Sequence, residues 1–204
     1  ATFPSLKRHE LEKYRYFMSG YEKAAAEYQK LIDTTRIGLI GHGFGGGAAP
    51  AMSFHLIKNR GWGHNGAFVY IMSPWYIHAI DLRELQTFPS HVKLIVQVFD
   101  QDNVNDPRIA WDMFKFIGIP SSEKQFLVMR SDQWGQCRLG ADNLTPLGSQ
   151  AFAGEDNALD HYGIFRPLDA LSSYAFEGDT TAKQIVFGDA KAHECFMGYW
   201  PDST

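Results

Sequence analysis

The chain has little of what marks several broad classes of protein. Its 204 residues include two cysteines, Cys137 and Cys195, too few for a disulfide scaffold and without metal-site spacing, although one bridge between them stays open. Basic residues are not in excess, because 19 Lys and Arg stand against 23 Asp and Glu. This balance argues against a nucleic acid or an anionic membrane surface as a partner. No apolar run approaches the roughly 18 residues of a membrane span.

What is present indicates a folded domain. Hydrophobic residues make up 45% of the chain and charged residues 21%, which is a globular composition. At roughly 150 residues per domain, the length predicts one domain over residues 1–204. The sequence contains no internal repeat and no linker-like stretch that would divide it.

Continuous apolar segments alternate with helical patterns along the chain. Apolar runs without a polar face are typical of parallel strands that are buried on both sides. The predicted fold class is therefore α/β, with a mainly parallel sheet flanked by helices. We expect strands at Thr35–Ile40, Ala67–Met72, Val92–Phe99 and Gln125–Met129, helices at Ala48–Lys58, Pro107–Ile117 and Pro167–Phe176, a long loop over residues 131–160, and a short strand or tail at Gln184–Phe187.

A further helix is expected before the first strand. Apolar residues recur in steps of three and four from Leu11 to Ile32, and charged residues such as Glu22 lie off that stripe. We interpret the stripe as a helix face that packs on the sheet. A short coiled-coil or partner-binding seam is the alternative, since only about three heptads are present.

A glycine-rich turn follows the first predicted strand. Gly41, Gly43 and Gly46 fit the G-x-G-x-x-G fingerprint of dinucleotide-binding proteins. That fingerprint needs an acidic residue about 20 positions further on, which holds the ribose hydroxyls. No Asp or Glu occurs between Asp33 and Asp81, so the fingerprint is incomplete. A dinucleotide-binding oxidoreductase is therefore kept only as the second alternative function, behind two functions that another motif in the same turn indicates.

The same turn resembles the nucleophile elbow of the α/β-hydrolase superfamily. Gly41-His42-Gly43-Phe44-Gly45-Gly46 is similar to the GHSxGG form of that motif in esterases and dienelactone hydrolases. Gly43 stands where the nucleophilic serine would be, and glycine fits the strained turn but has no hydroxyl. The resemblance therefore implies the hydrolase fold and an incomplete catalytic triad.

The resemblance also assigns an acid. In that family a later strand ends at the catalytic acid, and Lys93–Asp102 looks like that strand and its turn. Asp102 matches the acid best, with Asp100 as the alternative. A simpler interpretation is that this Asp- and Asn-rich turn caps the helix that starts near Pro107.

The catalytic histidine has two candidate positions. Leu139–Pro146 resembles the Ala-Asp-His-x-x-Pro loop of many such hydrolases, with Asn143 where the histidine would stand. His161 is the other candidate, although a histidine beside Asp160 and Tyr162 is more often a surface or capping residue. If Asn143 is the true equivalent, nucleophile and base are both lost.

Aromatic residues near the turn are candidates for substrate binding. Phe44 lies in the turn, and Trp75 and Tyr76 follow the next strand, where they would line an apolar pocket above the sheet or pack at its rim. His42 is interpreted as structural. Neither a cofactor nor a metal site is implied.

Only the second half of the hydrolase fold is represented, over about residues 10–177. The sequence therefore predicts a sheet that lacks the N-terminal strands and the oxyanion loop. We expect either that a second polypeptide supplies them or that the chain is the C-terminal part of a longer or processed protein. We expect a catalytically impaired pseudo-hydrolase that acts as a structural or small-molecule-binding partner. The first alternative is an active serine hydrolase of carboxylic esters or related acyl bonds, in which Gly43 replaces the natural nucleophile.

Overall fold

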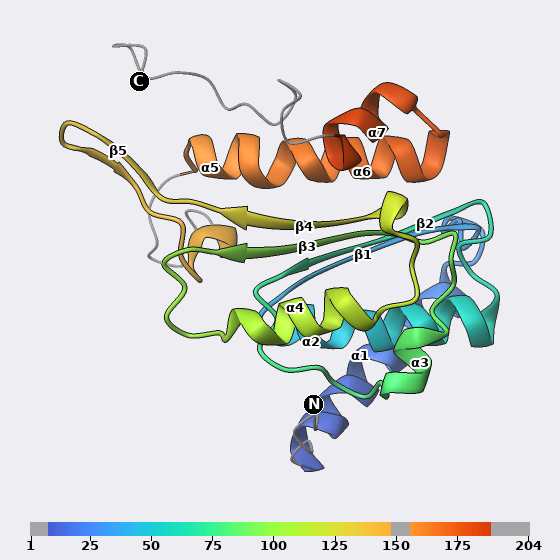
Figure 1. Ribbon diagram of the computed structural model, residues 1–204. Helices are drawn as coiled ribbons and strands as arrows, with labels where there is room; N and C mark the ends of the chain where they lie inside the picture. The colour runs from blue at the N-terminus through green and yellow to red at the C-terminus, as the bar shows by residue number, and fades with distance from the viewer. Residues whose placement is uncertain (1–7, 148–155, 189–204) are drawn as a thin grey trace.

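A four-stranded parallel sheet forms the centre of the molecule (Figure 1). The computed structural model describes residues 8–147 and 156–188. The strands lie in the order β1-β2-β3-β4, and each pairs in parallel with its neighbour, which confirms the predicted α/β fold class. Their bounds are Arg36–His42 (β1), Gly66–Met72 (β2), Lys93–Phe99 (β3) and Lys124–Met129 (β4).

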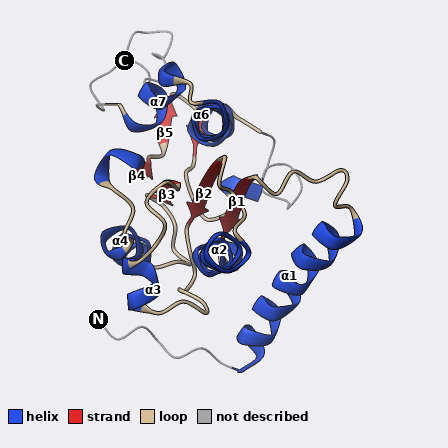
Figure 2. Cartoon of the chain, turned by 90° about the vertical axis from the view of Figure 1, so that its right-hand side faces the viewer, coloured by secondary structure: helices blue, strands red, loops and turns tan. Residues whose placement is uncertain are grey.

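Helices cover both faces of the sheet (Figure 2). One layer contains α1 (Arg8–Glu27), α2 (Phe44–Phe54), α3 (Leu82–Gln86) and α4 (Pro107–Phe116), and the other contains α6 (Arg166–Glu177) and α7 (Thr180–Phe187). None of the helices in the described parts of the chain combines the length and the apolar character that a membrane crossing needs.

Burial along the strands follows their position in the sheet. From their second residue on, β2 is buried throughout and β3 is buried throughout, as continuous apolar sequences predict for central strands. In β1 buried and exposed residues alternate, with Ile37 and Leu39 in the core and Ile40 exposed. This alternation is typical of a strand that is covered on one face only.

The turn between β1 and α2 is shorter than the sequence suggested. The helix expected from Ala48 begins four residues earlier, at Phe44, because Gly43 itself makes the turn out of the strand. It then continues as a π-helical turn, His55–Asn59, close to the predicted end at Lys58.

Two expectations about the last third of the chain are wrong. The predicted strand or tail at Gln184–Phe187 is the end of helix α7, which begins where the Asp179 carboxylate accepts the backbone N–H groups of Thr181 and Ala182. The predicted loop over residues 131–160 also contains regular structure. Its elements are the antiparallel pair β5 (Asp132–Trp134) and β6 (Cys137–Leu139) and the short helix α5 (Ala158–Asp160), which leads through a π-helical turn, His161–Phe165, into α6.

The first helix packs less than its apolar stripe suggested. Met18 is buried in the core and Tyr14 packs against it, but Tyr21 and Tyr28 are about half exposed. The helix ends at Glu27, so the last residue of the predicted stripe, Ile32, follows it in a turn. The expected packing on the sheet is therefore confined to the middle of α1.

Candidate functional site

The carboxyl ends of β1, β2 and β3 bring the predicted site residues to one edge of the sheet. Gly43 directly follows β1, Ser73 directly follows β2, and Asp102 lies in the turn after β3. In parallel sheets this edge is where ligands bind. The loop that carries Asn143 joins the same group, because its side chain is hydrogen-bonded to His42, the last residue of β1, and to Asn105, which follows β3.

Gly43 has a backbone conformation that favours glycine. Its φ is 55° and its ψ is −115°, values typical of the first central residue of a type II′ turn. The turn is fixed by backbone hydrogen bonds: Gly43 donates to the Met72 carbonyl at 3.1 Å, and its own carbonyl accepts from Gly47 at 3.1 Å and Trp75 at 3.0 Å. The strand-to-helix turn is therefore sharp and held from three sides.

The glycines of the turn differ in why they are needed. A Cβ at Gly41 would overlap the Gly45 carbonyl, one at Gly46 would press on the Met72 carbonyl, and one at Gly47 would overlap the Tyr76 carbonyl. A Cβ at Gly43 would meet no atom within 4 Å. Close packing therefore requires glycine on both sides of Gly43, whereas Gly43 itself has room for a side chain.

Asp102 is held by its own turn. Its Oδ1 accepts the backbone N–H groups of Val104 at 2.8 Å and Asn105 at 2.9 Å, and its Oδ2 accepts Nδ2 of Asn105 at 3.0 Å. Burial alone raises the pKa of Asp102, but the hydrogen bonds from the side chain and backbone of Asn105 and from Val104 outweigh it and leave the pKa below its usual range. Asp102 is therefore a fixed carboxylate.

The other acidic residues of this turn have separate roles. The helix cap at the start of α4 is Asp106, whose carboxylate accepts the backbone N–H of Arg108, so capping does not account for Asp102. Asp100 instead accepts the backbone N–H and the hydroxyl of Ser131. Of these three residues, Asp102 is the one connected to Asn143.

The connection runs through Asn105. Its Nδ2 also donates to Oδ1 of Asn143 at 2.6 Å, and that same oxygen lies 3.2 Å from Nε2 of His42. Burial lowers the pKa of His42, and its hydrogen bond to Asn143 opposes that shift only in part. The result is a chain of four side chains, Asp102–Asn105–Asn143–His42, with a neutral imidazole at one end and a carboxylate at the other.

His161 lies outside this chain. It is exposed at the start of the π-helical turn before α6, and its ring packs edge-on against Phe165 at 5.6 Å. None of the hydrogen bonds in the Asp102–Asn143 cluster involves it. The structure thus brings together Gly43, Asp102 and Asn143 and leaves the other candidate histidine elsewhere.

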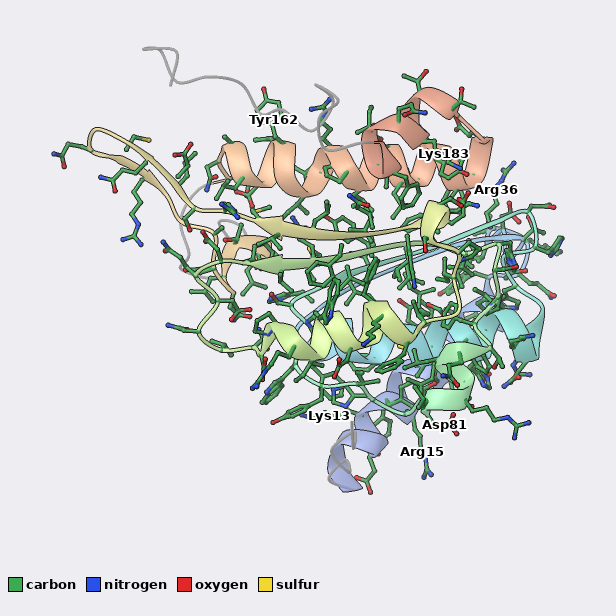
Figure 3. All side chains as sticks on the ribbon, viewed as in Figure 1. Lys13, Arg15, Arg36, Asp81, Tyr162 and Lys183 are labelled. Atoms are coloured by element: carbon green, nitrogen blue, oxygen red, sulfur yellow. The ribbon has the colours of Figure 1, made fainter. Side chains whose placement is uncertain are left out.

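The predicted aromatic residues lie beside the turn. Trp75 is 46% exposed, its ring lies 5.6 Å from that of Tyr76, and its backbone N–H binds the Gly43 carbonyl. The ring centres of Phe44 and His78 are 4.4 Å apart, and the ammonium of Lys13, a residue of α1 labelled in Figure 3, lies 5.6 Å from the centre of the Phe44 ring. Trp75 and Tyr76 therefore form an aromatic wall next to Gly43, whereas Phe44 contributes to packing.

Ser73 is a strained residue at the same edge. Its φ is 38°, its side chain is buried, and its hydroxyl makes no hydrogen bond of normal geometry within the described residues, although it is near enough to Asp102 to favour the charged carboxylate. It lines a cavity of about 10 Å³ together with Asp102 and Asn105. That space suits about one water molecule. Sequence reasoning missed Ser73 and Asn105, whose only signal is that both follow strands.

Comparisons with known proteins give no family for the chain. Models of known protein families do not match it, and no curated protein is significantly similar to it. Within residues 8–147 and 156–188, no group of three or more His, Cys, Asp and Glu side chains could hold a metal ion. Cys195, one of the two cysteines, lies outside the described residues, and Cys137 is a free, exposed thiol.

Proposed function

We propose that the chain is a catalytically impaired relative of the α/β-hydrolases that serves as a structural or ligand-binding partner. The observation that carries this proposal is the backbone at Gly43. A turn in the φ 55°, ψ −115° conformation is strained for any residue with a side chain, and such strain is typical of the nucleophile elbow. Here the turn is kept and the hydroxyl is absent.

The polar chain behind the turn supports the same proposal. A serine nucleophile needs a base that takes its proton, and the base is oriented by a carboxylate. Asp102 is fixed and charged, but its line of hydrogen bonds leads to the amides of Asn105 and Asn143, which cannot take a proton at neutral pH. The acid is therefore not hydrogen-bonded to a base, because the two amides separate it from the imidazole of His42.

The aromatic wall formed by Trp75 and Tyr76 is the surface on which the protein would bind a small molecule. Trp75 offers a half-exposed indole, its backbone N–H binds the Gly43 carbonyl, and the ring of Tyr76 lies against it. Small-molecule sites are lined mainly by apolar and aromatic side chains, with a few polar groups among them. A ligand with an aromatic or acyl portion would lie on this wall, beside the Gly43 turn.

Fluorophosphonate labelling, read by intact mass, tests the proposal. We expect no adduct on the unmodified chain. Gly43→Ser alone should also stay unlabelled because Asn143 cannot act as base, whereas Gly43→Ser combined with Asn143→His should form an adduct. Gly45→Ser is the matched control, since a Cβ there also meets no atom within 4 Å but the residue lies inside α2.

The alternative function is an active serine hydrolase whose serine has been replaced at Gly43. The open space around the Gly43 Cβ position favours it, because the Cβ of a serine there would meet no atom within 4 Å. Strong labelling and ester turnover by Gly43→Ser alone would select this alternative. Labelling of the unmodified chain at any residue of the turn would contradict the pseudo-hydrolase proposal.

A further inference from the structure

One edge of the sheet is left without a partner in the described part of the chain. β1 pairs with β2 on one side only. The Gly43 N–H points to the Met72 carbonyl of β2, and N–H groups alternate in direction along a strand, so those of Gly38 and Ile40 point away from β2. An open row of donors and acceptors is a template for another strand.

The helix layer on one face is wider than the sheet. α2 packs on β1 and β2, and α4 packs on β3 and β4, so these two helices cover the four strands. α1 lies further out, beyond β1, and packs extensively on none of the described strands (Figure 2). A helix about 10 Å across covers about two strands spaced 4.8 Å apart. The layer therefore has room for about two strands next to β1.

The surface around this gap includes several exposed apolar side chains. Ile40 is 51% exposed on the face of β1 opposite α2. A cleft of about 390 Å³ lies between the end of α1 and Trp62, and its lining is apolar at Ala25, Ala26, Ile32 and Trp62 and polar at Glu22, Gln29, Thr34 and Arg60. Large side chains of α1 and the turn after it stay substantially exposed, namely Tyr16, Phe17, Tyr21, Tyr28, Leu31 and Ile32.

Polar contacts hold α1 in this outlying position. Glu22 of α1 binds the Arg60 guanidinium and lies 3.3 Å from Nε2 of His55 at the end of the α2 segment. These contacts and the buried Met18 attach one side of α1 to the body of the protein. The other side of the helix is exposed beyond the edge of the sheet. α1 is therefore placed where it could cover additional strands, which the described residues do not provide.

We propose that the free edge of β1 binds an extended segment of a second polypeptide, which continues the sheet under α1. Its backbone would pair with Gly38 and Ile40. Its side chains would be apolar on both faces, one row packing on α1 and the other extending the surface that begins at Ile40. The proposal depends on the sheet edge and not on the chemistry at Gly43.

A second copy of the chain fits this edge poorly. Two β1 strands related by a two-fold axis pair antiparallel. Each α1 would then lie over the partner copy's β1, on the face that α2 already covers. A partner of different sequence avoids this conflict.

The test uses a fluorescent ten-residue peptide of alternating valine and isoleucine, with a lysine at each end, and measures its binding by anisotropy. We expect saturable binding below 1 mM that Ile40→Lys weakens at least ten-fold. Val128→Lys is the matched control, because Val128 is 52% exposed on the opposite edge strand, β4. The amides of Gly38 and Ile40 should exchange rapidly in the chain alone and slowly with the peptide.

Three results would overturn the proposal. They are no binding at 1 mM, equal weakening by both lysine variants, and slow exchange of the Ile40 amide in the chain alone. Slow exchange that appears only at high protein concentration, together with a dimer mass by light scattering, would assign the edge to a second copy instead. None of these results depends on fluorophosphonate labelling, so the two proposals fail separately.

Discussion

Alanine at Gly43 should destabilise the protein, although it causes no clash. With φ at 55° and ψ at −115°, a residue with a Cβ is strained by about 1 to 3 kcal/mol. The reduced freedom of alanine in the unfolded chain returns about 0.4 to 1 kcal/mol. The net loss in the free energy of unfolding should therefore be about 1 to 2 kcal/mol, measured by urea denaturation of Gly43→Ala.

Two neighbouring glycines provide the controls. A Cβ at Gly45 also meets no atom within 4 Å, but Gly45 lies in α2, so Gly45→Ala should stabilise the protein by about 0.5 to 1 kcal/mol. Gly47→Ala should be worse than either, because its Cβ would overlap the Tyr76 carbonyl. If Gly43→Ala is as stable as Gly45→Ala, the positive φ at Gly43 is wrong and the argument from the turn fails with it.

Two further predictions concern the packing on the other face of the sheet. Glu123 binds Lys93 and Lys183, both at 2.7 Å, and Glu123→Gln should cost about 1.5 to 3 kcal/mol in urea denaturation at pH 7. Burial raises the pKa of Glu123, but its lysine partners lower it below the usual range. The stabilisation is therefore present above pH about 4.5 and lost as the pH falls through the lower folded pKa. A difference in unfolding free energy between the unmodified chain and Glu123→Gln that stays constant from pH 7 to 3 would contradict the ion pairs. Tyr70 Oη donates to Oε1 of Gln97 at 2.5 Å in the core, so Tyr70→Phe should lower the thermal midpoint at a cost of about 1 to 3 kcal/mol, and an unchanged midpoint would contradict the buried bond.

The central strands were predictable because a strand that is buried on both faces has apolar residues at consecutive positions. The run expected at Ala67–Met72 is β2, one residue longer, and the run expected at Val92–Phe99 is β3, one residue shorter. The glycine turn was also recognisable, because three close backbone approaches leave only glycine at neighbouring positions. These features are local, and a single stretch of sequence contains them.

Features set by distant contacts were not predictable. Asn105 links Asp102 to Asn143, which lies 38 residues further along the chain, and no local pattern marks such a bridge. The apolar stripe of α1 indicated a helix but not how much of it would be covered. Helix α7 is eight residues long, too short for its period to outweigh the strand-like end Gln184–Phe187.

Ester hydrolysis by the unmodified chain tests the central claim most directly. With p-nitrophenyl acetate at neutral pH, the account predicts a rate equal to that of buffer containing a denatured sample, and a measurable rate only after Gly43→Ser and Asn143→His are combined. Esterase activity that co-purifies with the unmodified chain and is lost in Asp102→Asn would contradict the account. It would show that a nucleophile other than residue 43 works at this edge of the sheet.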